Sequence, residues 1–113
     1  MNYMDLATAV ALKSPSRFRL GAVLVKRRKV LGVGFNNMAK THPRMERFNN
    51  QTFTLGLHAE VAACVGIPLI DLEGADLYVV RLLKNGKRAL AKPCYICQKF
   101  IAHVGIRGVY YSE

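Results

Sequence analysis

Two short motifs contain the residues of this sequence whose types and spacing are best suited to chemistry. They are His58-Ala59-Glu60 and Pro93-Cys94-Tyr95-Ile96-Cys97. Proline is favoured at the first position of a helix, so the second motif predicts a helix start with both thiols on one face. The helix dipole stabilises thiolates there and lowers their pKa toward the range in which zinc binds. The pattern therefore predicts a metal site.

One imidazole added to these thiolates completes a ligand set. We predict that His58, Cys94 and Cys97 bind one zinc ion. Three protein ligands leave the fourth position of a tetrahedral ion to water, which is typical of a catalytic zinc and not of a structural one. Two thiolates and a neutral imidazole also balance the double positive charge of the ion.

Glu60 follows the predicted histidine ligand by two residues, so its carboxylate can share the cavity without binding the metal. We expect Glu60 to take a proton from the attacking water and to deliver it to a ring nitrogen and then to the departing amine. Together these groups suit hydrolytic attack on an amidine carbon with loss of ammonia.

A Cys-x-x-Cys motif alone has other interpretations, namely half of a structural zinc site or a redox pair. A structural site with three thiols would need Cys64, which follows His58 by six residues on the same predicted helix. That spacing places the two residues about 120° apart around the helix axis. We therefore expect Cys64 to be buried and inert. A thioredoxin-like pair would follow the first strand of its domain, and this pair does not.

An alternating order of helices and strands is predicted to position both motifs. Apolar spacing and chain breakers indicate helices that start near residues 3, 58 and 94, the last one ending at Gly105. The same signals indicate strands over 22–25, 30–35, 75–83 and 109–111, the first two forming a hairpin with a basic turn. This order predicts the α/β class, with a mixed sheet of about four strands covered by helices. Residues 37–57 show no period and predict a long functional loop.

With its His-x-Glu and Pro-Cys-x-x-Cys motifs, the chain resembles the cytidine and deoxycytidylate deaminase superfamily. The resemblance covers almost the whole chain. It implies a three-layer α/β/α fold, here in a minimal form without the usual fifth strand, and one catalytic zinc ion per chain. It also implies that Asn36 contacts the sugar, that the amide of Ala59 contacts the base, and that the carbonyl of Lys92 accepts from the leaving amino group. Lys92 stands where the family usually has a small residue, so the roof of the pocket is expected to differ.

Length and composition limit the class of protein. The 113 residues, 51% hydrophobic and 21% charged, predict one globular domain over 1–113. The chain lacks both a signal peptide pattern and a long apolar run, so we expect a cytoplasmic protein without a membrane partner. Seventeen Lys and Arg residues against seven Asp and Glu give a net charge of +10, which attracts phosphates. A last strand exposed at the sheet edge predicts a homo-oligomer.

Three hypotheses for the function remain. The first is deamination of a free cytosine nucleotide or nucleoside, with deoxycytidylate preferred because the segments 41–43 and 91–94 look like those of deoxycytidylate deaminases. Lys40, Arg44 or Arg47 would then meet the phosphate. The second is deamination of cytosine in single-stranded DNA or RNA, and the third is a non-enzymatic nucleic-acid-binding module with structural zinc, which gives Glu60 no task. For the second, the stacking platforms would be Tyr95, Tyr110 and Tyr111.

Overall fold

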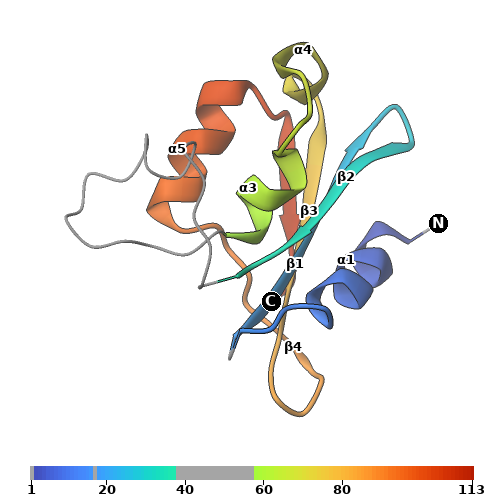
Figure 1. The fold of residues 1–113 in the computed structure, drawn as a ribbon, viewed down its shortest axis with the longest axis vertical. Helices are drawn as coiled ribbons and strands as arrows, with labels where there is room; N and C mark the ends of the chain where they lie inside the picture. The colour runs from blue at the N-terminus through green and yellow to red at the C-terminus, as the bar shows by residue number, and fades with distance from the viewer. Residues whose placement is uncertain (1, 17, 38–57) are drawn as a thin grey trace.

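The computed structural model describes residues 2–16, 18–37 and 58–113, and its elements follow the predicted order (Figure 1). All of the predicted functional loop except Asn37 lies outside the described residues. The helices are α1 (Tyr3–Ala11), α3 (Ala59–Cys64), α4 (Leu69–Leu72) and α5 (Tyr95–Val104). The strands are β1 (Arg19–Lys26), β2 (Lys29–Phe35), β3 (Asp76–Leu82), β4 (Arg88–Ala89) and β5 (Gly108–Tyr111).

The strands form one mixed sheet, which confirms the α/β class. β1 pairs antiparallel with β2 on one side and with β3 on the other. The far edge of β3 is shared, because β5 pairs with 76–79 in parallel and β4 pairs with 81–82 antiparallel. The described residues thus form five strands in four lateral positions, which corrects the expected number of about four. The additional strand, β4, has two residues and is too short to show a periodic pattern.

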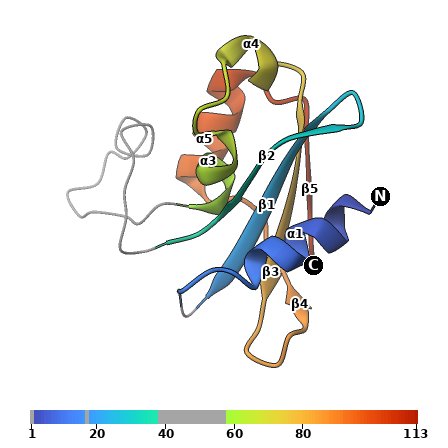
Figure 2. The ribbon, with the colours of Figure 1, turned by 45° about the vertical axis from the view of Figure 1, so that its right-hand side comes forward.

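Two hydrophobic clusters lie on opposite faces of the sheet and give the expected α/β/α layers (Figure 2). α1 covers one face and packs over Val23 and Val80, whereas α3 and α5 cover the other face and pack over Leu24 and Leu77. Adjacent residues of β1 therefore belong to different clusters, as expected for a strand that is buried on both faces.

Helix α3 lies very close to β2, and this contact fixes the position of the first motif. A β-carbon at Gly32 or Gly34 would overlap backbone atoms of Ala63. Glycine at these positions allows the helix to rest directly on the strand. Glu60, one turn before Ala63, is consequently held in the core with 3% of its surface exposed.

One helix boundary differs from the sequence prediction. Cys94 is the N-cap of α5 and Pro93 precedes it, so proline is not the first helical residue. Helix α3 ends at Cys64, shortly before Gly66, whose φ of +80° is left-handed. The predicted end of α5 is confirmed, since Gly105 caps it with a φ of 79°. Among the described residues, no helix has the length and apolar character needed to cross a membrane.

Candidate active site

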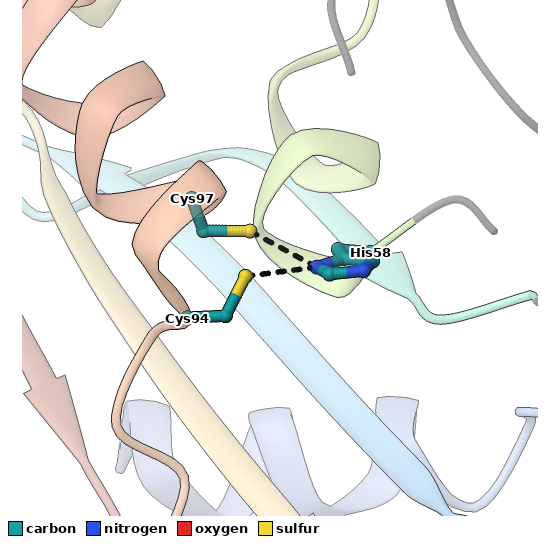
Figure 3. A group of neighbouring side chains, drawn as sticks. All are labelled: His58, Cys94 and Cys97. Carbon is teal, nitrogen blue, oxygen red and sulfur yellow. Dashed lines mark hydrogen bonds between the residues drawn. The ribbon is translucent and has the colours of Figure 1, made fainter. Parts of the chain in front are cut away.

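The two motifs come together where α3 and α5 begin (Figure 3). His58 is the N-cap of α3, Cys94 is the N-cap of α5, and Cys97 lies in the first turn of α5. Nδ1 of His58 lies 3.3 Å from Sγ of Cys97 and 3.4 Å from Sγ of Cys94. All three ligand atoms lie within 4.8 Å of one another. The structure thus brings the three predicted ligands to one point.

These distances fit a tetrahedral zinc site. In a tetrahedral site, bonds of about 2.0–2.1 Å to nitrogen and about 2.3 Å to sulfur place a nitrogen ligand and a sulfur ligand about 3.6 Å apart. The observed separations of 3.3 and 3.4 Å are close to this value. Cys64 is buried, as expected, and does not belong to the group. The donor set is therefore one nitrogen and two sulfurs, which suits a catalytic zinc.

The electrostatics of the group show which protons a metal ion would displace. A hydrogen bond from the Cys97 thiol, helped by His58, lowers the pKa of Cys94 to about 4 against the effect of burial. The same hydrogen bond, together with burial, raises the pKa of Cys97. The hydrogen bond to Cys94 also raises the pKa of His58, although burial opposes this. Without metal, the thiolate form is favoured at Cys94 and the protonated form at Cys97 and His58, so zinc must compete with protons at the last two residues.

Glu60 is suited to carry protons beside this group. Burial raises the pKa of its carboxyl above the ordinary value, while the charge of His58 partly opposes that shift. A carboxyl with a raised pKa exchanges protons more readily near neutral pH. Among the described residues, Glu60 does not belong to the cluster of ligand atoms.

A cavity of about 480 Å³ opens onto the metal site. Its volume lies within the range of about 300–1,000 Å³ that is usual for small-molecule sites. The three predicted substrate-binding residues, Asn36, Ala59 and Lys92, all contribute to its wall, as do His58 and Glu60. The full lining is Ser16, Phe18, Leu20, Asn36, His58, Ala59, Glu60, Lys92 and Cys94.

Sequence reasoning missed Ser16, Phe18 and Leu20, which form one wall of the cavity. Their residue types carry no chemical signal. Their position directly before and within the first strand is the only feature of the sequence that points to them.

Asn36 also has a structural role that the sequence did not reveal. Its side-chain Oδ1 accepts hydrogen bonds from the Leu20 amide at 2.8 Å and from the Ser14 hydroxyl at 2.6 Å. Its Nδ2 donates to the carbonyl of Phe18 at 2.6 Å. These bonds connect the end of β2 to the cavity wall. Among the described residues, the second hydrogen of Nδ2 has no partner, so Asn36 can donate it to a ligand.

The tyrosines proposed as a stacking groove do not form one. Tyr110 stacks on Tyr78 on the α1 face of the sheet, whereas Tyr111 packs against the cluster on the opposite face. Tyr95 lies on α5, where Lys99 covers its ring. Side chains of adjacent strand residues point to opposite faces, which explains the separation. The predicted phosphate contacts Lys40, Arg44 and Arg47 lie outside the described residues.

Comparison with known proteins identifies the family. Residues 1–113 match the family profile of the cytidine and deoxycytidylate deaminase zinc-binding region. The chain belongs to the cytidine and deoxycytidylate deaminase family. This deaminase is 34% identical to the deoxycytidylate deaminase of Mycobacterium phage D29, over 98% of this chain and 91% of the relative.

Solved structures of other deaminases have a similar fold. The dCMP deaminase of cyanophage S-TIM5 in its apo form has a TM-score of 0.65 and 28% identity, covering 96% of this chain and 78% of that one. A mutant form of the cytidine deaminase of Mycobacterium tuberculosis has a TM-score of 0.58 and 23% identity, covering 98% of this chain and 82% of that one. The protein is thus a zinc-dependent deaminase. Within the described residues, His58, Cys94 and Cys97 are the one group that fits its zinc ion.

Proposed function

We propose that this enzyme hydrolyses deoxycytidylate to deoxyuridylate and ammonia. The observation that carries the proposal is the arrangement of His58, Cys94 and Cys97 with Glu60 at one cavity of nucleotide size. The phage D29 relative is a deoxycytidylate deaminase, and a second structure of the cyanophage enzyme holds dCMP and dUMP. These relatives support the same substrate here.

The chain's own residues supply the proton transfers. When bound, zinc makes water acidic enough to act as a nucleophile near neutral pH. Glu60 takes the proton that this water loses and delivers it to the ring nitrogen next to the carbon under attack. A second proton then moves through Glu60 to the amino group, and the carbon–nitrogen bond breaks as ammonia leaves. Water is consumed, and Glu60 returns to its starting state.

Three residues of the cavity wall are proposed to hold the substrate. The amide hydrogen of Asn36 that has no partner among the described residues would bind a sugar oxygen. The amide of Ala59 is in the first turn of α3, where it has no partner within the helix, and would contact the base. The carbonyl of Lys92, which lies just before α5, would accept a hydrogen bond from the leaving amino group.

Turnover of a substrate panel tests the proposal. Zinc-loaded protein is incubated with cytidine, deoxycytidine, their monophosphates and a cytosine-containing single strand, and ammonia and uracil are followed. We expect the highest kcat/KM for deoxycytidylate. Conversion of the strand with no conversion of the monophosphates would show that the enzyme acts on polynucleotides. Protein with Glu60→Gln is the matched control for contaminating activity.

The assembly of the enzyme is also a proposal. β5 pairs only with β3 among the described strands, and a groove lined by Ile101, Ile106, Val109 and Tyr111 lies beside it. An open strand edge next to apolar side chains favours pairing with another copy, so we propose a cytoplasmic homo-oligomer of one-domain subunits. Sedimentation equilibrium measures the mass, and a monomer at micromolar concentration would contradict the oligomer.

A further inference from the structure

The tip of the β1–β2 hairpin is a run of four cations, Lys26-Arg27-Arg28-Lys29, that the active site does not use. This segment is called the basic tip. It projects at the end of the hairpin opposite to the start of β1 and the end of β2 (Figures 1 and 2). The six residues of β2 that follow Lys29 separate the basic tip from the cavity end of the strand by roughly 20 Å at about 3.3 Å per residue. The basic tip is therefore separate from the deaminase site.

The backbone of the basic tip is held in a conformation that arginine rarely adopts. Arg27 has a φ of 52° and Arg28 a φ of 65°, both in the left-handed region. Hairpin turns with two such residues strongly prefer Asn-Gly. The turn between β3 and β4 contains Asn85-Gly86, and Gly86 takes the left-handed φ there. Non-glycine residues held in this backbone region cluster at active sites and ligand-binding segments.

The charges of the two arginines are not neutralised within the described part of the chain. Both side chains are exposed, and the ion pairs there join Arg88 to Asp5 and Arg107 to Asp76. Lys26 extends beside them and donates a hydrogen bond of 3.0 Å to the carbonyl of Ile70 in α4. The hairpin and α4 enclose a hollow lined by Lys26, Arg27, Lys29, Leu31, Ile70 and Asp71. Three cations and one acid there leave an excess of positive charge.

We propose that the basic tip binds the phosphate backbone of double-stranded nucleic acid. β1 pairs with β3 as far as Val25, so the turn extends past the sheet edge and can lie against a groove of a duplex. Guanidinium groups at its apex can pair with phosphate oxygens in two-point contacts. The hollow and tip contain no aromatic residue, so they lack the stacking platforms that single strands use. The net charge of +10 adds long-range attraction to a polyanion.

The double variant Arg27→Asn/Arg28→Gly removes the two charges of the basic tip without weakening the fold. This variant has the preferred turn sequence, so its melting temperature should rise by a few degrees while its affinity for the duplex falls. Fluorescence anisotropy with a DNA duplex of about 20 base pairs measures affinity across a salt series. We expect the affinity to fall on the order of 50-fold at about 0.1 M salt and the logarithmic salt slope to decrease by about two.

A matched control removes the same charge from the other hairpin. Lys84→Gln/Lys87→Gln also lowers the net charge by two and should keep most of the duplex affinity. Both variants should deaminate free nucleotides like the wild type, because neither hairpin tip lines the cavity. Equal losses in both variants, or unchanged affinity in the Arg27→Asn/Arg28→Gly protein, would overturn the proposal. Binding to anionic phospholipid vesicles in preference to the duplex would also overturn it.

Discussion

At the scale of single residues, Glu60 is the group whose chemistry can be separated from metal binding. Its carboxyl is buried beside the ligands without belonging to them. Glu60→Gln should therefore lower kcat at least about a hundredfold and keep close to one zinc per chain. Ammonia release and elemental analysis of the same sample measure both quantities. Loss of zinc from this variant would mean that Glu60 belongs to the ligand set.

The same variant has a predictable effect on stability. Because burial raises the pKa of Glu60 in the folded state, ionising this carboxyl opposes folding. The protonated Glu60 carboxyl therefore contributes to stability below its ordinary pKa. This contribution is lost as the pH rises through the pKa of the carboxyl in the folded protein. Glutamine stays neutral, so at about pH 8 the variant should melt at or above the wild-type temperature.

Cys94 offers a second test at the residue scale. In metal-free protein its lowered pKa, about 4, makes it a thiolate at acidic pH, and its side chain is exposed. Iodoacetamide at about pH 6 should modify Cys94 before the two buried thiols, and the reaction should fade only as the pH falls toward 4. Peptide mass spectrometry locates the label. Zinc should protect Cys94, and a rate that increases only above about pH 8 would contradict its thiolate state.

At the scale of elements, Ser14 is predicted to position the cavity wall. Its hydroxyl contacts Asn36 and accepts the Ser16 amide at 3.2 Å, connecting the segment after α1 to the end of β2. Ser14→Ala should cost about 1 kcal/mol of unfolding free energy and raise KM more than it lowers kcat. Steady-state kinetics with thermal melts separate these effects, and Ser14→Thr should restore KM. A lower melting temperature with unchanged KM would mean that Ser14 only supports the fold.

The helices and strands also show how much of the fold and of the candidate site the sequence alone could predict. The proximity of Cys94 and Cys97 and the end of α5 follow from local signals, because Cys-x-x-Cys spacing and a left-handed glycine act within one turn. The approach of His58 to these cysteines depends on tertiary packing. The predicted start of α5 near residue 94 is early by one residue, because Cys94 is the N-cap and has an extended backbone. The bond between Ser14 and Asn36 joins residues 22 positions apart, so it depends on how the hairpin packs beside α1. No local pattern contains that information.

At the scale of the whole molecule, the basic tip and the zinc ligands lie in different places. Zinc ligands and Glu60 lie where α3 and α5 begin, whereas the basic tip is at the far end of β2. Catalysis on a nucleotide and attachment to a duplex can therefore be altered independently. The proposed duplex contact also needs none of the tyrosines, which the sheet distributes over both of its faces.

Zinc should stabilise the whole fold, because its ligands connect the starts of two helices that come from distant parts of a small chain. Free zinc at about 1,000 times the dissociation constant adds about 4 kcal/mol to the free energy of unfolding. For a domain near 100 residues this corresponds to a melting temperature about 15–30 °C higher. Calorimetry before and after chelation measures the difference, and a shift of zero would exclude a structural contribution.

The pH dependence of this stabilisation has a defined sign. Zinc must displace the protons of Cys97 and His58, whose pKa values are both raised, so the apparent affinity for zinc should fall as the pH decreases. For His58 the competition with protons begins above the ordinary histidine pKa and strengthens as the pH falls through it. Cys97→Ser should abolish the zinc-dependent shift, whereas Cys64→Ala should lower stability equally with and without zinc. Zinc retention by the Cys97→Ser protein at neutral pH would require a different ligand.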